Sequence, residues 1–301
     1  MREQIIVTGS TTSEPPVVSV VIPCHNAALT LAQTLEAMLR QTFAGSFEVI
    51  LVNNGSTDES VAIARKFQKQ FPHFTILDAT EKLGAGYARN VGVSYASADR
   101  LLFCDADDIA DHGWITAMVA ALEKADLVGG RREWRRLNQK SHPAARKPEG
   151  SLDVNYLGPD RVACVGAGNM GIWRHLFELL DGFDTRLPIH EDSDLCLRAH
   201  NYGFHVSLCP DAIIHVRARH GLRATFKQGC AWGYWSVPLY TKHVDLLGKR
   251  STMMRQLLGW PLLFFRLFFI FRVGYRTTWV FTAGWKIGQT YGYLTSQRFR
   301  R

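Results

Sequence analysis

The sequence predicts an α/β fold in which a mostly parallel sheet is flanked by helices and followed by a C-terminal amphipathic helical extension. Two observations support the sheet. Short β-branched or apolar runs alternate with segments that repeat apolar residues at helical spacing, which is typical of strands joined by helices. Several of these runs lead directly into polar turns, as is typical of the carboxyl ends of parallel strands. A third observation, a change of composition over residues 217–301, predicts the extension.

The first 130 residues contain five expected strands and four expected helices in alternation. Residues 17–22 form a β-branched run that ends before a proline, and residues 29–39 then repeat Leu and Met at helical spacing. The same succession predicts strands over residues 49–52, 74–77, 101–104 and 127–129, and helices over residues 60–71, 86–95 and 114–123. Strands that alternate with helices in this way favour a parallel sheet covered on both faces.

The pattern changes after the fifth expected strand. Residues 131–150 are rich in Arg, Lys and Pro and show no periodicity, which predicts a long loop that is functional or mobile. Beyond it, the sequence predicts a short helix over residues 176–180, a longer one over 192–202, and late strands over 206–208 and 212–216. In the longer helix we expect Leu195, Leu197 and Ala199 to face the core.

The C-terminal part combines positive charge with aromatic residues. The formal net charge of the chain is +8, yet residues 217–301 hold 15 Lys and Arg against one acidic residue, together with 18 of the 34 aromatic residues. Such a composition is typical of a part that binds either nucleic acid or an anionic membrane surface. Its aromatic residues cluster with Leu and Ile instead of alternating with the basic residues, which disfavours nucleic acid.

One stretch of this part predicts an amphipathic helix. Residues 257–271 hold 12 apolar residues in 15, which is too short for the run of about 20 that a membrane-spanning helix needs. On a helix, Arg266, Arg272 and Arg276 share one face, opposite Phe264 and Phe271. We therefore expect a helix that lies in an anionic membrane surface. A helix pair packed on the rest of the protein, or a dimer interface, is the alternative.

The six cysteines are scattered and form no C-x-x-C pair, which predicts reduced thiols in a cytosolic protein and no zinc site of that spacing. The N-terminal residues do not combine a charged start with a long apolar core, so no signal peptide is expected. No G-x-x-x-x-G-K sequence occurs, which excludes a P-loop.

Three carboxylates, Asp105, Asp107 and Asp108, follow the expected strand over residues 101–104. Carboxylates at positions i and i+2 can bind one hard divalent cation, which relieves their mutual repulsion. The alternative is an acidic turn or a helix N-cap, where Asp is also favoured.

Five stretches resemble, in order, the motif set of family 2 glycosyltransferases. They are VSVVIPCHN (residues 18–26), VNNGSTD (52–58), GAGYARNVG (84–92), CDADD (104–108) and EDSDLCLR (191–198). The resemblance covers residues 16–220. It implies the Rossmann-like fold called GT-A, a nucleotide-sugar donor, a divalent metal and inversion at the anomeric carbon.

The resemblance also implies a metal site. Asp105 and Asp107 match the positions whose carboxylates hold the metal and the donor, and Asp108 is expected to support them. His215, 23 residues after Asp192, is similar in position to a third metal ligand of many family members. Taken alone, a histidine at the end of an apolar strand is more often a hydrogen-bonded core residue than a metal ligand. The metal is expected to be Mn²⁺ or Mg²⁺.

Asp192 is similar in position to the family's general base, with Glu191 beside it. Inverting transfer needs one carboxylate to take the proton of the acceptor hydroxyl as that hydroxyl attacks. The alternative is that both acids only favour the dipole at the start of the helix.

The remaining matches fall on the donor site. The resemblance places Pro23, His25, Asn26 and Asn54 around the nucleobase, where the family often has an aromatic residue at the position of His25 and Asp at the positions of Asn53 and Asn54. Imidazole can still stack on a base, and an amide can still hydrogen-bond to it. The expected donor is a UDP-sugar. The resemblance also places Arg89 near a phosphate of the donor; the alternative is a surface ion pair. It places Gly168 and Asn169 along the donor sugar; the alternative is a tight entry into a strand.

Together these expectations describe an enzyme that transfers a sugar to a hydroxyl of a lipid-linked or cell-surface glycan, at the inner face of the cell membrane. We expect an N-terminal tail (1–16), a catalytic domain (17–225, with a nucleotide half 17–130 and an acceptor half 151–225) and a membrane-associating extension (226–301). The alternatives are a sugar nucleotidyltransferase, which would need a basic Gly-rich loop after the first strand, and a scaffold without catalysis.

Overall fold

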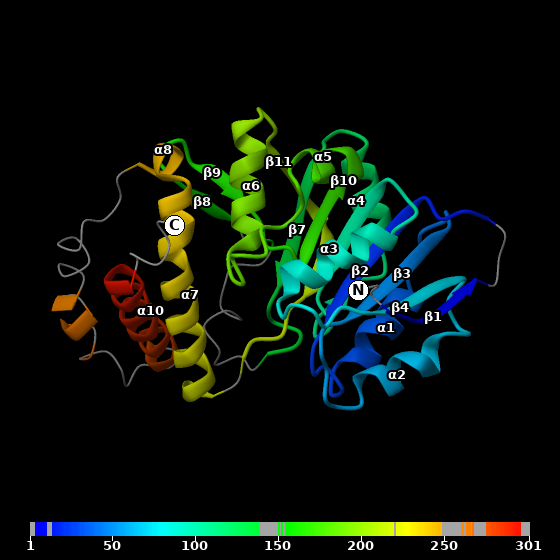
Figure 1. The fold of residues 1–301 in the computed structure, drawn as a ribbon, viewed down its shortest axis with the longest axis horizontal. Coiled ribbons are helices and arrows are strands. Elements are labelled where there is room, and N and C mark those ends of the chain that lie inside the picture. The colour runs from blue at the N-terminus through cyan, green and yellow to red at the C-terminus, as the bar shows by residue number, and fades with distance from the viewer. Residues whose placement is uncertain are drawn as a thin grey trace.

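The computed structural model describes residues 4–10, 14–138, 150, 152, 154–219, 221–248, 260–261, 263–265, 267 and 275–295. Its centre is one sheet of nine strands (Figure 1). Across the sheet the strands are β1 (Gln4–Ser10), β4 (His73–Asp78), β3 (Phe47–Asn53), β2 (Val18–Cys24), β5 (Arg100–Cys104), β10 (Asn169–Trp173), β7 (Leu127–Glu133), β11 (Val206–His215) and β6 (Ile109–Ala110). Strands β2 to β5 are parallel, whereas β10 runs antiparallel between β5 and β7. The predicted fold class is confirmed.

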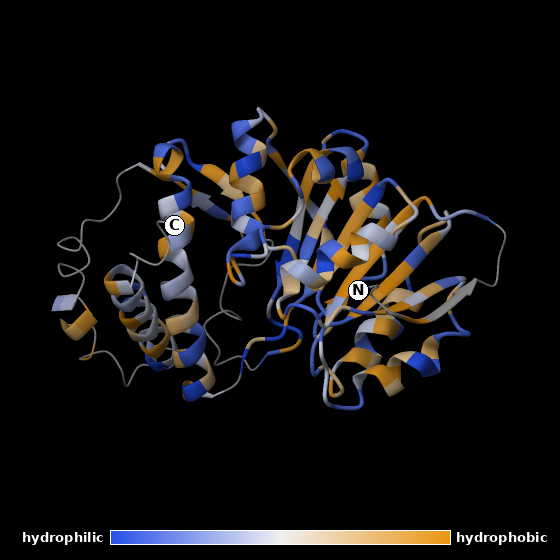
Figure 2. Cartoon of the chain, in the orientation of Figure 1, coloured by the Kyte–Doolittle hydropathy of each residue, from blue (hydrophilic) through white to orange (hydrophobic). Residues whose placement is uncertain are grey.

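Helices cover both faces of the sheet because its central strands are apolar on both sides. Along β2, Val18, Val20 and Ile22 face a core shared with α1 (Leu31–Leu39), α2 (Ser60–Phe67) and α4 (Trp114–Leu122). Val21 points to the opposite core, which is shared with α3 (Ala85–Tyr95), α5 (Arg174–Leu179) and α6 (Glu191–Asn201). Figure 2 shows these strands as the most hydrophobic part of the chain. The expected inward residues of α6, Leu195, Leu197 and Ala199, are all buried.

Several strands differ from the sequence prediction. Residues 4–10, which we expected to belong to a tail, form β1 and pair antiparallel with β4, the outermost parallel strand. The two expected late strands are one strand, β11, whose pairing with β7 is irregular between Cys209 and Ile213. Strand β7 continues to Glu133, inside the expected loop. The chain also forms the hairpin β8 (Asn155–Leu157) and β9 (Val162–Cys164), whose three-residue strands are too short to show periodicity.

The C-terminal part is mainly a pair of long helices, α7 (Leu222–Lys242) and α10 (Tyr275–Thr295), with the short α8 (Val244–Leu247) after the first. The two long helices touch along glycines: a Cβ atom at Gly233 would lie 2.0 Å from the carbonyl oxygen of Trp285, and one at Gly288 would lie 1.9 Å from that of Cys230. Only glycine permits backbones this close. Most of the amphipathic helix expected over residues 257–271 lies outside the described residues.

A buried ion cluster joins this helix pair to α6. Asp194, which is fully buried, accepts hydrogen bonds from Arg198 Nε at 2.8 Å and His243 Nε2 at 2.8 Å, and Lys242 Nζ lies 2.6 Å away. Burial opposes ionisation, yet the hydrogen bond from His243 and the charges of Arg198 and Lys242 keep the pKa of Asp194 below its ordinary value. The expected boundary at residue 225 falls within the first turn of α7. Of the described helices, none combines the length and the apolar content that crossing a membrane requires.

Candidate active site

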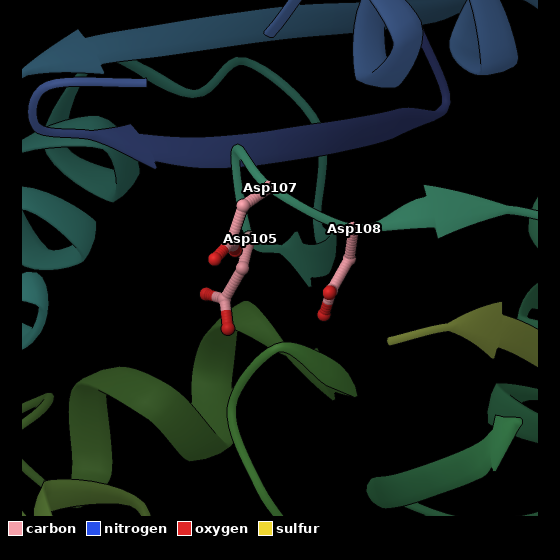
Figure 3. A group of neighbouring side chains, drawn as sticks. All are labelled: Asp105, Asp107 and Asp108. Carbon is pink, nitrogen blue, oxygen red and sulfur yellow. The ribbon is translucent and has the colours of Figure 1, made fainter. Parts of the chain in front are cut away.

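Three carboxylates gather where β5 ends. The ligand oxygens of Asp105, Asp107 and Asp108 all lie within 4.8 Å of one another, on a turn that connects β5 to β6 (Figure 3). Helix α1 fixes the turn, because the buried Thr34 donates its hydroxyl to the carbonyl oxygens of Ala106 at 3.0 Å and Asp108 at 2.7 Å. The turn therefore presents its acids from a rigid support.

Charge repulsion within this group favours a cation. Desolvation and the charge of Asp105 raise the pKa of Asp107, and burial together with both neighbouring charges raises the pKa of Asp108 well above its ordinary value. Asp108 also accepts the backbone N–H of Arg217 at 3.1 Å. Clustered carboxylate oxygens of this kind fit a hard divalent cation, whose charge would offset their repulsion.

Arg89 connects the carboxylate turn to helix α6. It was expected to reach a phosphate, but its side chain is buried and donates to Asp105 Oδ1 at 2.6 Å and to Glu191 Oε1 at 2.9 Å. Burial and the charge of Asp192 raise the pKa of Glu191 to about 7, against the lowering effect of Arg89. Arg89 thus holds two acids in place instead of meeting solvent or a surface partner.

Asp192 lies on the first turn of α6, after a left-handed residue. His190, with φ of 71°, turns the chain into the helix. The Asp192 carboxylate accepts the backbone N–H of Ser193 at 2.6 Å and that of Ala167, from the segment before β10, at 3.3 Å. These donors fix the orientation of a carboxylate that remains half-buried.

The segment before β10 also touches the carboxylate turn. A Cβ atom at Gly168 would lie 2.3 Å from Asp105 Oδ2, so only glycine fits beside that acid in its present position. Because Ala167 bonds to Asp192 and Gly168 packs on Asp105, two adjacent residues bring together acids that are 87 positions apart in the sequence.

Asn169, the residue that follows, is buried and its amide is fully used. Its oxygen accepts Trp114 Nε1–H at 2.8 Å, and its nitrogen donates to the carbonyls of Arg131 at 3.0 Å and Ala212 at 3.1 Å. Expected along the donor sugar, this side chain instead joins α4, β7 and β11 and so holds the preceding glycine segment in place.

The loop after β2 leaves two of the expected nucleobase residues open. His25 and Asn26 are exposed, and His25 Nδ1 bonds to the Asn54 carbonyl at 2.7 Å. The Asn54 side chain, by contrast, is buried: it donates to the carbonyls of Ala79 and Lys82 and accepts the N–H of Gly84 at 2.7 Å. Asn54 therefore stabilises the protein around the loop and does not offer its side chain to a base. Pro23, near the end of β2, is half-buried.

His215 ends β11 and is buried, but it lies outside the close group of aspartate oxygens found among the described residues. Its Nδ1 lies 2.8 Å from Glu133 Oε2, and its Nε2 lies 3.1 Å from Arg136 Nη1. A carboxylate only accepts and a guanidinium only donates, so Nδ1 carries the hydrogen and Nε2 the lone pair. This is the tautomer that a metal-binding histidine uses when a carboxylate orients it.

Glu133 and Arg136 were missed by sequence reasoning. Both lie in the stretch over residues 131–150 that was expected to be a loop, although Glu133 is the last residue of β7. The signal that could have found Glu133 is its place at the carboxyl end of a strand parallel to β11, the same rule that singled out Asp105.

Comparisons with known proteins agree with this arrangement. Residues 19–178, more than half of the chain, match the family described as Glycosyl transferase family 2. The chain belongs to this family. The glycosyltransferase AglE of Haloferax volcanii is 37% identical to this family 2 chain over 126 residues, which are 41% of the chain and 41% of that protein. A PGL/p-HBAD biosynthesis glycosyltransferase of Mycobacterium bovis is 39% identical over 187 residues, which are 61% of the chain and 69% of that relative.

The fold is shared with solved glycosyltransferases. The mannosyltransferase PcManGT of Pyrobaculum calidifontis, solved with GDP-Man and Mn²⁺, matches with a TM-score of 0.64 at 18% identity over 95% of this chain and 89% of that one. At this low sequence identity, the similarity shows that the two proteins share a fold and no more than that. The predicted family and fold are confirmed, while this family 2 chain spans less than half of the length of its Haloferax relative.

Proposed function

We propose that this protein is an inverting, metal-dependent glycosyltransferase that moves a sugar from a nucleotide-sugar donor to an acceptor hydroxyl. One observation carries the proposal: the adjacent residues Ala167 and Gly168 contact Asp192 and Asp105, so that one short segment brings the two acids together. A cation-binding group for the leaving diphosphate and an oriented carboxylate for the acceptor are the two parts that such a reaction needs.

Each part has its own residues. Asp105 and Asp107 would hold Mn²⁺ or Mg²⁺, with His215 as a further ligand; the bound metal supplies stabilisation of the negative charge on the departing nucleoside diphosphate. Asp192 takes the proton of the attacking hydroxyl, and the N–H groups of Ser193 and Ala167 keep its carboxylate oriented. Arg89 keeps Asp105 and Glu191 in place through one hydrogen bond to each carboxylate.

The nucleobase is the least constrained part of the donor. His25 and Asn26 are exposed beside the end of β2 and offer an aromatic ring and an amide to a base. We propose a UDP-sugar, and a GDP-sugar is the alternative because the structural neighbour PcManGT was solved with GDP-Man.

A thermal-stability screen tests the donor and the metal together. Unfolding would be measured with a panel of UDP- and GDP-sugars, each with Mn²⁺ and with a chelator. The matching donor is expected to stabilise the protein by about 2.7 kcal/mol at 100 times its dissociation constant, and only when Mn²⁺ is present.

The Asp107→Ala variant should lose the metal-dependent part of that stabilisation. Asp181→Asn is the control: it also removes one carboxylate, at an exposed position, and asparagine readily adopts the left-handed φ of 57° found there. Equal stabilisation with and without metal would contradict the metal role.

Product analysis by NMR should show that the anomeric configuration of the transferred sugar is inverted relative to the donor.

The acceptor is proposed to be a lipid-linked or cell-surface glycan, reached at the inner face of the cell membrane. Next to the proposed base, the His190 ring lies 5.9 Å from that of Trp232 on α7 and 6.0 Å from that of Trp285 on α10, and Phe281 lies 6.0 Å from Trp232. Half-buried aromatic faces of this kind suit sugar rings or apolar chains.

Exposed apolar side chains on the C-terminal part support the membrane contact. Among the described residues they include Phe264, Phe265, Leu267, Tyr275, Ile287, Tyr291 and Leu294. A recess of about 280 Å³ among them is lined by Leu263, Tyr275, Thr278, Trp279 and Thr282. We propose that the chain from residue 226 onward associates with an anionic membrane surface, through apolar insertion and basic charge.

Liposome flotation tests this contact. The wild-type protein is expected to float with vesicles that contain anionic lipid, and the double variant Phe264→Gln, Phe265→Gln should float several-fold less, because each of these side chains is 59% exposed. Leu29→Gln, at a side chain that is 96% exposed on the other part of the chain, is the control and should float like the wild type. Flotation that is unchanged in the double variant would place the contact elsewhere.

A further inference from the structure

The turn after β7 is fastened beside His215. Both oxygens of Glu133 accept backbone N–H groups of the turn, that of Arg135 at 2.6 Å and that of Arg136 at 3.1 Å. Glu133 Oε2 is also the acceptor of the His215 Nδ1 hydrogen bond. One carboxylate therefore sets the position of the turn and the orientation of the imidazole.

The far end of the turn is fastened to the chain on the other side of His215. The buried Asn138 donates to the carbonyls of Trp134 and Val216, each at 2.7 Å, and accepts the N–H of Ala218 at 2.7 Å. These bonds connect the turn directly to the residues that follow His215. The placement of Arg136 over the imidazole is thus built into the backbone rather than left to a free loop.

The contact of Arg136 with His215 occupies the atom that a metal would need. Since Nδ1 donates to Glu133, Nε2 holds the lone pair of the imidazole, and Arg136 donates to it at 3.1 Å. The single lone pair of Nε2 can bind either Arg136 or a metal, but not both. A guanidinium next to a divalent cation would also be repelled by the charge of that cation. The Arg136 side chain is exposed, so it can return to water at small cost.

We propose that Arg136 guards the metal-ligand position of His215: it holds the Nε2 lone pair while the metal is absent and has to leave before a divalent cation binds there. Glu133 acts as a positioning residue, because it keeps the hydrogen on Nδ1 and the lone pair toward Arg136. The proposal rests on the metal-dependent function proposed above. As a consequence, the apparent affinity for the metal equals the intrinsic affinity multiplied by the fraction of molecules in which Arg136 does not contact His215.

Mn²⁺ binding to the full chain without donor tests this, with the electron paramagnetic resonance signal of free Mn²⁺ as the readout. Arg136→Gln is expected to tighten Mn²⁺ binding by about 3- to 10-fold, because the competing guanidinium is gone. Arg135→Gln is the matched control, because it removes the same charge from the neighbouring exposed position. Its effect should be clearly smaller, because it is Arg136 that donates to His215 Nε2.

Two further variants connect the effect to His215. In a His215→Ala background, which should bind Mn²⁺ more weakly, Arg136→Gln is expected to give no tightening beyond that of Arg135→Gln. Glu133→Gln should weaken Mn²⁺ binding, because an amide can donate to Nδ1 and so admit the other tautomer. Thermal unfolding of each variant shows whether it is folded.

The outcomes separate this inference from the proposed function. If His215→Ala weakens binding but Arg136→Gln behaves like Arg135→Gln, the guard role is overturned and the metal site stands. If Arg136→Gln tightens binding equally with and without His215, the residue acts on the aspartates by charge, and the inference also fails. If Asp107→Ala and His215→Ala both leave Mn²⁺ binding unchanged, the proposed metal function itself fails.

Discussion

Replacing Asp192 with Asn is expected to lower the turnover number by about 10²- to 10⁴-fold, which is the usual contribution of a positioned general base. The amide keeps the size of the side chain, and its single oxygen can keep one of the two backbone hydrogen bonds, since Ser193 donates to Oδ1 of Asp192 and Ala167 to Oδ2. It cannot take the proton of the acceptor hydroxyl. Donor affinity should therefore stay close to that of the wild type, and the loss should appear in turnover.

The measurement is steady-state transfer with the donor that the stability screen identifies, together with donor binding by calorimetry. Asp181→Asn makes the same chemical change at an exposed position and should retain wild-type turnover. Turnover of Asp192→Asn within a few-fold of the wild type would assign the base to another group. A parallel loss of donor affinity would instead indicate that Asp192 shapes the donor site.

Replacing Arg89 with Met is expected to reduce the free energy of unfolding by about 3–5 kcal/mol at pH 8, which is the usual cost of removing one partner from a buried ion pair. The guanidinium lies between Asp105 and Glu191, and its own side chain is only 4% exposed. Its loss leaves both acids without their buried cation, and nothing in a methionine side chain replaces the two hydrogen bonds.

The loss should depend on pH. In the wild type the pKa of Glu191 is raised to about 7 by burial and Asp192, although Arg89 lowers it; without Arg89 it rises further. A carboxyl whose folded pKa is raised makes the protein less stable as the pH increases from its unfolded pKa through its folded one. The deficit of Arg89→Met should therefore be smaller at pH 5 than at pH 8.

Urea denaturation in a chelating buffer at both pH values measures this deficit. Arg40→Met is the control, because Arg40 pairs with Glu36 on the surface, with side chains 62% and 52% exposed, and should change stability by less than about 1 kcal/mol. A deficit below 1 kcal/mol for Arg89→Met at pH 8, or one that shrinks as the pH rises, would contradict the buried role of this residue.

The parallel strands could be predicted because their residues are apolar on both faces. Val20 and Val21 are adjacent and both fully buried, so β2 needs a core on each side, and a continuous apolar run is how such a strand appears in a sequence. Strand β1 could not be predicted in this way. It has one neighbouring strand, β4, and the half-exposed Ile5 shows that burial constrains it less.

Within the candidate site, the sequence predicted which residues lie near the site more accurately than it predicted what each side chain binds. Arg89, Asn54 and Asn169 were selected by their motifs, yet each side chain is buried and bonded to the protein itself. A motif marks a residue as needed near the site, but whether the side chain faces a ligand or the protein depends on neighbours. For Arg89 that neighbour is Glu191, 102 positions away.

The sequence by itself determined the parallel strands β2 to β5, the helices that alternate with them, and the acids that follow β5 and begin α6, because local apolar patterns and strand ends can be recognised from consecutive residues. Only the tertiary structure decided which acids meet, that Arg89 lies between them, and that Glu133 and Arg136 hold the two nitrogens of His215. The physical reason is that hydrogen bonds and burial act between groups close in space, and these groups come from separate elements of the chain.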